Sequence, residues 1–306
     1  PATQTHPNPL RRRTATRRHS IIASLLNIPE VVVAVNKMDL VGYAEDTFEN
    51  IKREYETVAK RLGLKSVHYF PISAFVGDNI VNTTEAMPWY KGTSLLDFLE
   101  TIEISQNSYK EPRFQVQYVI RPQTEALHDY RGYAGEIISG TYRKGDAIVV
   151  LPEGISTKIS KIERNGEEVA EAKAGEPVVM HIEDDIDISR GDYFASEEAE
   201  PTQSQEIEAI VCWMDKRALK EGNKYLLQQR SRLVKVVVKE IAYKIDVNTL
   251  DQEEEVESVK LNEIAKIHIK AAAPLVYDAF ADNPPMGSAI LIDETSNATV
   301  GAVMIA

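Results

Sequence analysis

The sequence predicts the C-terminal part of a doubly wound α/β domain followed by two β-barrels. Up to about residue 102, runs of β-branched residues alternate with stretches of helical period, as in a parallel sheet covered by helices. Beyond residue 104 the apolar period becomes two, and short candidate strands follow one another between Gly and Asp residues. The pattern divides the chain into an irregular tail and three domains, at residues 1–15, 16–108, 109–200 and 201–306.

Composition narrows the possible function classes. The 306 residues are 43% hydrophobic, which suffices for several ordinary cores, and no apolar run approaches the roughly 18 residues of a membrane span. The formal net charge of −12 makes non-specific binding to nucleic acid unfavourable. The single cysteine, Cys212, lies in an apolar run and is expected to be a buried core thiol. A chain without a possible internal disulfide fits the reducing cytoplasm.

Residues 1–15 differ from the rest. They hold three prolines and no apolar periodicity, and five arginines without an acid fall within residues 1–20. This start resembles a transit peptide or a twin-arginine signal, but no adequate apolar region follows it. We expect an irregular tail at the beginning of a truncated coding sequence.

The α/β part contains two candidate strands and three candidate helices. The strands, Val31–Val35 and His68–Ile72, are short apolar runs that end at polar groups. Apolar residues at helical spacing predict helices over 16–27, 46–62 and 94–102.

The first strand leads directly into Asn36-Lys37-Met38-Asp39, which has the form of the guanine-specificity loop of GTPases. A carboxylate at Asp39 can accept hydrogen bonds from N1 and N2 of guanine, which adenine lacks. Asn36 can brace the loop, and Lys37 can lay its aliphatic stem along the base. A polar turn after a core strand is the alternative interpretation of these four residues alone.

A second signal follows the second strand. Ser73 and Ala74 are the small pair that closes over guanine in GTPases, where a backbone N–H reaches the base carbonyl oxygen. Because both loops follow parallel strands, they are expected to meet at one edge of the sheet. The two signals together predict a guanine site.

The barrel part contains two sets of candidate strands. The first set is Phe114–Arg121, Tyr133–Ser139, Ala147–Leu151, Lys158–Glu163 and Pro177–Ile182. The second set is Glu206–Trp213, Leu233–Ile245, Ile264–Ile269, Ala289–Ile292 and Thr299–Met304.

These features together resemble the translation-factor class of GTPases. Within that class, several motifs resemble the large, GTP-binding subunit of bacterial ATP sulfurylase (sulfate adenylyltransferase subunit 1), from about Thr16 to the end of the chain. They are Tyr118–Pro122, Arg131–Gly135, Ile186–Asp192, Tyr243–Thr249 and Ser296–Ala302.

The resemblance implies a regulatory GTPase that works within a heteromer. In that family a smaller catalytic subunit joins ATP and sulfate to give adenosine 5′-phosphosulfate, and GTP hydrolysis on the large subunit drives this uphill reaction. The implied cofactors are GTP and, in the complete protein, Mg²⁺. Neither a membrane nor nucleic acid is an expected partner.

The sequence departs from the family in the phosphate-binding part. No Gly-rich loop followed by Lys and Ser/Thr is present, and the nearest spacing, Gly140–Gly145, is followed by Asp146 and Ala147. No hydrolytic residue can therefore be assigned, no metal-ligand spacing is found among the histidines, and we expect this chain by itself to be inactive and to bind GTP poorly.

Two alternatives stay open at this stage. One is an elongation-factor-like translational GTPase whose barrels bind tRNA. The other is a barrel module without a nucleotide function.

Overall fold

The computed structural model describes residues 16, 19–26, 28–103, 109–122, 130–246 and 251–306. The described residues up to Glu103 form one compact unit, and those from Tyr109 onward form a second. Within the described part of the chain, no helix combines the length and the apolar character needed to span a membrane.

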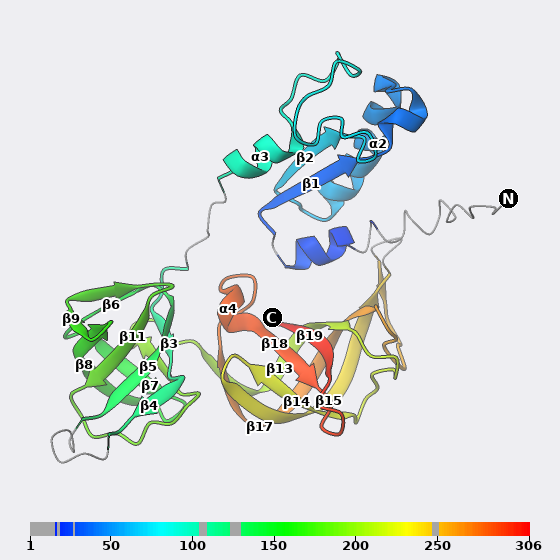
Figure 1. Cartoon of the computed structure of the whole chain (residues 1–306). Coiled ribbons are helices and arrows are strands. Elements are labelled where there is room, and N and C mark those ends of the chain that lie inside the picture. The colour runs from blue at the N-terminus through cyan, green and yellow to red at the C-terminus, as the bar shows by residue number, and fades with distance from the viewer. Residues whose placement is uncertain (1–15, 17–18, 27, 104–108, 123–129, 247–250) are drawn as a thin grey trace. The chain divides into compact units, whose positions relative to one another are not determined.

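The first unit is built on two parallel strands with helices around them (Figure 1). Strand β1 (Glu30–Val35) pairs in parallel with β2 (Ser66–Pro71), with Val31 opposite Val67 and Val35 opposite Pro71. The long helix α2 (Glu45–Arg61) connects them, as expected for a parallel crossover. The remaining elements are the short 3₁₀ helix η1 (Met38–Val41), the helical residues 19–25 and helix α3 (Leu95–Thr101).

The sequence of α2 explains where it begins and ends. Glu45 and Asp46 occupy its first turn and Lys60 and Arg61 its last, which suits the helix dipole at both ends. Within α2, the buried residues are Phe48 and Ala59. The predicted helices 46–62 and 94–102 agree with α2 and α3 to within one residue at each end.

Aromatic and sulfur-containing side chains fill the core of the first unit. Met38 and Met87 are each 1% exposed and pack with Val35 and Phe48. Trp89 packs against Phe48, with ring centroids 5.4 Å apart, and its indole N–H donates to the Tyr43 carbonyl oxygen at 2.9 Å.

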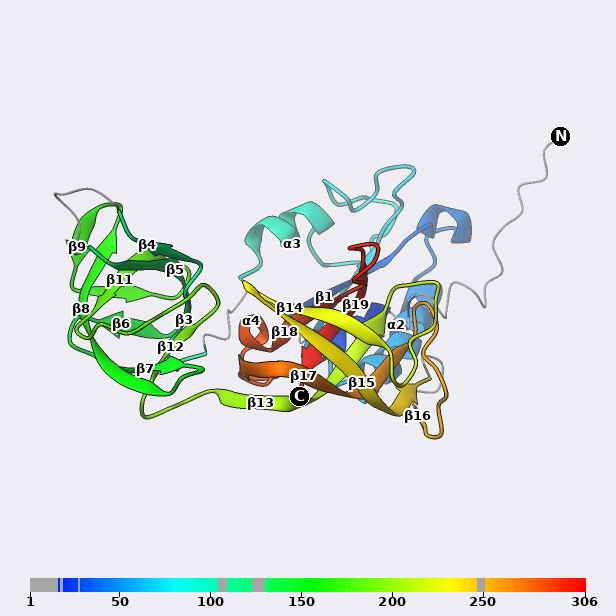
Figure 2. The same cartoon turned by 90° about the horizontal axis from the view of Figure 1, so that it is seen from below.

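The second unit holds two barrels (Figures 1 and 2). In the first barrel, six strands close in the order β5-β3-β12-β7-β8-β11, and β11 pairs back with β5. The strands are β3 (Arg113–Gln115), β5 (Gly132–Ser139), β7 (Ala147–Leu151), β8 (Ile155–Arg164), β11 (Pro177–Ile182) and β12 (Tyr193–Ser196). Short strands flank the ring: β4 (Tyr118–Ile120), β6 (Thr141–Arg143), β9 (Glu167–Val169) and β10 (Glu171–Lys173).

The second barrel also closes with six strands, in the order β14-β18-β19-β13-β17-β15 and back to β14. Alternating residues of its long strands point inward, so that Ile207, Ala209, Val211 and Trp213 of β13 are buried. The strands are β13 (Thr202–Trp213), β14 (Lys224–Gln229), β15 (Arg232–Ile245), β17 (Ile264–Tyr277), β18 (Ser288–Ile292) and β19 (Thr299–Ile305). Strand β16 (Gln252–Glu253) extends β15, and the one-turn helix α4 (Pro284–Gly287) precedes β18.

Three details of the sequence prediction were wrong. Phe114–Arg121 is not one strand: β3 ends at Gln115 and the chain resumes as β4 at Tyr118, where it still pairs with β5 but no longer with β12. Two barrel-closing strands, β12 and β14, were missed. Cys212 is only partly buried, because it alternates with the inward residues of β13, and this partial burial raises the pKa of its thiol.

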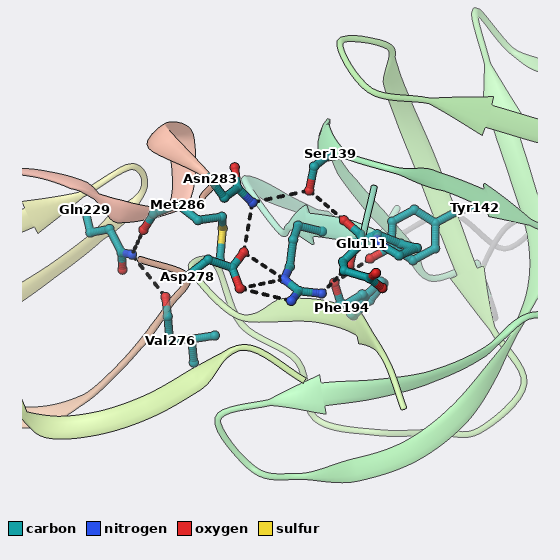
Figure 3. A network of polar contacts seen from close by, with 11 residues as sticks. Glu111, Ser139, Tyr142, Phe194, Gln229, Val276, Asp278, Asn283 and Met286 are labelled. Carbon is teal, nitrogen blue, oxygen red and sulfur yellow. Dashed lines mark hydrogen bonds and ion pairs between the residues drawn. The ribbon is translucent and has the colours of Figure 1, made fainter. Parts of the chain in front are cut away.

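A buried polar network joins the two barrels (Figure 3). Arg113 of β3 and Asp278, which follows β17, form a two-pronged ion pair, with Nε to Oδ2 and Nη2 to Oδ1 both at 3.0 Å. Their side chains are 2% and 6% exposed. Asn283 donates to Asp278 Oδ2 at 2.8 Å, and Gln229 Nε2 donates to the carbonyls of Val276 and Met286.

Candidate functional site: two loops at the ends of parallel strands

The two loops singled out by the sequence begin at the same edge of the β1–β2 sheet. Val35 and Pro71 are opposite each other at the ends of their strands. The ladder continues one step further, since Ile72 N donates to Val35 O at 2.9 Å and Met38 N donates to Ile72 O at 3.2 Å. The register of the strands therefore brings Asn36 and Ser73 to neighbouring positions.

Side-chain hydrogen bonds connect the loops. Ser73 Oγ donates to Asp39 Oδ1 at 2.7 Å. The Ala74 backbone N–H donates to Asn36 Oδ1 at 2.9 Å, and the same oxygen accepts from the Lys37 N–H at 2.7 Å. All five predicted residues thus lie in one connected constellation, although they come from two segments about 35 residues apart.

The first loop is a tight turn with an apolar anchor. Lys37 has a φ of 72°, in the left-handed region, and the chain then enters η1 at Met38. Met38 is 1% exposed, so its side chain fixes the loop to the core while Lys37 on one side stays exposed and Asp39 on the other half-exposed. The sequence Lys37-Met38-Asp39 thus places one buried apolar side chain between two polar side chains that stay accessible.

The second loop is held from beneath. Ser73 is fully buried, and its Oγ accepts from the Val76 N–H at 3.3 Å. Asn79, 1% exposed, donates from Nδ2 to Pro71 O at 2.9 Å and accepts at Oδ1 from the Thr84 N–H at 3.0 Å. The Asn79 amide therefore fixes the end of β2 relative to the following loop.

A hydrogen bond also ties the second loop to the segment that follows the first. The Tyr43 hydroxyl donates to Asp78 Oδ2 at 2.8 Å, and this bond is the main reason that the pKa of Tyr43 is raised. Since the indole of Trp89 donates to the Tyr43 carbonyl, Tyr43 links both loops to the core.

Phe75 is a feature that sequence reasoning missed. Its side chain is 94% exposed, directly after Ala74, and Leu40 beside Asp39 is 72% exposed. Single exposed apolar side chains are common on protein surfaces, and these two are of interest because each directly follows a predicted site residue. The sequence does indicate them, because Leu40 directly follows Asp39 and Phe75 directly follows Ala74, so that an apolar residue stands beside each motif.

The constellation suits a planar base with hydrogen-bond donors and does not suit a metal ion. Asp39 is its only carboxylate, and its other groups are an amide, a hydroxyl, an ammonium and a backbone N–H. Among the described residues no group of three or more His, Cys, Asp or Glu side chains is placed to hold a metal. The residues present therefore do not fit Mg²⁺, and we assign it no ligands in this chain.

Comparison with known proteins shows what the chain is similar to. Residues 11–105 match the model of the elongation factor Tu GTP-binding domain, and residues 206–306 match that of the GTP-eEF1A C-terminal domain. Sulfate adenylyltransferase subunit 1 of Chromobacterium violaceum is 43% identical over 96% of this chain. The bifunctional enzyme CysN/CysC of Mycobacterium tuberculosis is 42% identical over 95% of it. Over nearly its whole length, the chain is thus similar to the sulfate adenylyltransferase subunit 1 family.

The chain spans 61% of the length of the Chromobacterium violaceum relative of this family and 48% of the Mycobacterium tuberculosis one. Among solved structures, Sup35 complexed with GMPPNP has a TM-score of 0.59 and 20% identity, covering 95% of this chain and 72% of that one. That likeness concerns the fold, which is a GTP-binding domain of the elongation factor type followed by two six-stranded β-barrels.

Proposed function

We propose that this chain binds the base of GTP at Asn36, Lys37, Asp39, Ser73 and Ala74, as the GTP-binding part of a sulfate-activating heteromer. The observation that carries the proposal is the pair of bridges between the loops, Ser73 to Asp39 at 2.7 Å and Ala74 to Asn36 at 2.9 Å. A turn without a ligand has no need for two cross-links that hold a carboxylate at the surface.

Asp39 is the specificity residue of this proposal. The Ser73 hydroxyl occupies one position on Oδ1 and fixes the plane of the carboxylate, which leaves Oδ2 and a further lone pair of Oδ1 for two donors. Guanine presents N1–H and N2–H side by side, whereas adenine presents an acceptor at N1. A site built for those donors rejects the base that lacks them by about 10⁴-fold or more.

The other residues position the base. The aliphatic stem of Lys37 and the exposed ring of Phe75 supply apolar surface for its faces. The Ala74 N–H, which Asn36 accepts in this structure, is shared with the base carbonyl oxygen when the nucleotide is bound.

On the scale of the assembly, we propose that sulfate adenylylation takes place on a smaller partner subunit in the cytoplasm. The name "subunit 1" of the relatives supports a partner, and the sequence resemblance supports a division of labour in which GTP hydrolysis drives the joining of ATP and sulfate. The translation-factor alternative has less specific support, namely the two elongation-factor domain matches and a shared fold with Sup35 at 20% identity.

The test is a change of base preference. Asp39→Asn replaces an acceptor by an amide donor, so it should favour xanthosine, which has a carbonyl oxygen where guanosine has the N2 amino group. We expect the 306-residue chain to prefer guanosine over xanthosine at least tenfold, and the variant to reverse that order, in titrations followed by NMR. Nucleosides are used because they report on the base alone.

Asp46→Asn is the matched control, since Asp46 is exposed in the first turn of α2 and is expected to leave both affinities unchanged. Equal affinities of the Asp39→Asn variant and the unaltered chain for guanosine would reject the assignment of Asp39.

A further inference from the structure

The outer edge of β2 carries unpaired backbone groups. Ile72 faces β1, because its N–H donates to Val35 O and its carbonyl accepts from Met38 N. Alternate residues of a strand in a parallel sheet direct their backbone groups to opposite sides, so Pro71, Tyr69 and Val67 face away from β1. The Asn79 amide on Pro71 O agrees with this direction. Within the described part of the chain β2 pairs with no strand except β1.

This edge forms the floor of a groove of about 570 Å³. Glu45, Glu49, Lys52 and Glu56 of α2 line it on one side (the α2 wall), and Phe98 of α3 and the segment Trp89–Thr93 contribute further lining residues. Among the described residues of the first unit, the groove therefore runs beside Val67 and Tyr69 between α2 and α3.

The two walls differ in chemistry. The α2 wall holds three carboxylates and one ammonium, and Lys52 is already 3.7 Å from Glu49. The α3 side is apolar, since the rings of His68 and Phe70 both pack on Phe98, at 4.5 and 5.1 Å between centroids. A strand added at the edge places alternate side chains on these two sides.

A polar group near the α2 wall also lacks a partner. The Tyr69 hydroxyl is buried without a hydrogen bond in the described structure. The Lys52 ammonium lies 5.9 Å from the Tyr69 ring centroid.

We propose that the outer edge of β2 binds an extended segment of a partner protein, which adds as a strand beside Val67–Tyr69. Main-chain hydrogen bonds hold such a segment, and pockets for alternate side chains select it. The acidic α2 wall selects basic side chains at every second position, and Phe98 with its neighbours selects apolar ones between them. This surface is separate from the guanine site and does not depend on the proposed nucleotide function.

The probe is a fluorescein-labelled peptide of three Lys-Val repeats, titrated with the 306-residue chain at 150 mM salt and followed by anisotropy. Val67→Pro removes the backbone N–H that points away from β1 and puts the proline ring in its position. The hydrogen bonds between β2 and β1 keep all their donors, because the Val67 N–H takes no part in them. We expect the substitution to weaken binding at least tenfold. Val67→Ala, which keeps the N–H, is the matched control and should change binding less than twofold.

Charge is tested independently of the backbone. Glu49→Lys with Glu56→Lys should weaken binding at least fivefold, whereas Asp46→Lys, on the same helix but outside the groove, should not. A peptide of the same sequence with every backbone amide N-methylated keeps the charge and loses the donors, so it should not bind. Circular dichroism confirms that each variant is folded.

Three results would overturn the proposal. Equal binding of the N-methylated peptide would mean simple charge attraction to an acidic chain. Unchanged binding by a folded Val67→Pro variant would place the peptide elsewhere. A dimer in sedimentation experiments that Val67→Pro abolishes would show that the edge pairs with a second copy of this chain.

Discussion

Ser73 differs from the other four residues of the proposed guanine site, because the protein encloses it completely. Its hydroxyl donates to Asp39 and accepts from the Val76 N–H, so it sets the orientation of the carboxylate without being accessible to a base itself. Under the proposed function, the position of its hydroxyl affects the affinity for the base, whereas the identity of the preferred base depends on Asp39.

We expect Ser73→Ala to lower guanosine affinity about five- to tenfold, which corresponds to the roughly 1 kcal/mol of one hydrogen bond. The order of guanosine over xanthosine should be kept. Ser24→Ala, which removes a hydroxyl that donates to Leu62 O at 2.6 Å in the same unit, is the control. A reversed base order in Ser73→Ala would mean that Asp39 does not select the base.

Glu163 of the first barrel gives a pH dependence. The Lys161 ammonium, then the Tyr130 hydroxyl and His181, hold the pKa of this carboxyl at about 2, and its side chain is only 14% exposed. The pKa of Glu163 in the folded chain lies below its value of about 4.3 in the unfolded chain. The charged carboxylate therefore stabilises the folded state fully above about pH 4.3, and this stabilisation is lost as the pH falls toward 2.

Glu163→Gln should therefore lower the free energy of unfolding at pH 7 by about 2 kcal/mol. The difference from the unaltered chain should shrink between pH 4 and pH 2. Urea unfolding at pH 7, 4 and 3 measures both values, and a difference independent of pH would contradict the ion-pair account.

At the scale of elements, the sequence predicted strands that contain several β-branched residues and missed β12 and β14, which contain none. Ala147–Leu151 and Pro177–Ile182 were predicted with their observed bounds. The missed β12 has three consecutive buried residues, Tyr193, Phe194 and Ala195, because one barrel covers one side and the neighbouring barrel the other. No alternation exists there to be detected.

The residues of the proposed guanine site could be predicted to converge, because parallel strands end at one edge. The particular bond from Ala74 to Asn36 could not be predicted, since it depends on backbone geometry around Lys37. The pair of Arg113 and Asp278 was equally inaccessible, because 165 positions separate the two residues and only the closed barrels bring them together.

The Arg113–Asp278 pair makes the junction between barrels sensitive to single substitutions. Arg113→Met leaves a buried carboxylate with the Asn283 amide as its remaining donor, and we expect a loss of about 3–5 kcal/mol. Adding Asp278→Leu removes the uncompensated charge, so the double variant should recover most of that loss. Urea unfolding of the single and double variants measures the coupling, and additive losses would contradict it.

At the scale of the whole chain, the sequence combines the proposed base site with no recognisable phosphate loop. Guanosine, GDP and GTP should therefore bind the 306-residue chain with affinities within about threefold of one another, because the phosphates add few contacts. Calorimetry or NMR titration compares the three ligands. A GTP affinity more than tenfold above that of guanosine would reveal phosphate-binding residues outside the motifs considered.

The junction between the barrels also restricts how this architecture can be recombined. On an isolated barrel, Arg113 or Asp278 would be hydrated. When the barrels dock, both charges lose this hydration, which costs free energy. Only a facing surface with the complementary charge in the same place offsets that cost. A chimera that takes one barrel from a distant homologue needs Arg113, Asp278, Asn283 and Ser139 to be exchanged as a set. Barrels that differ at these positions would remain folded but undocked, joined only by their linker.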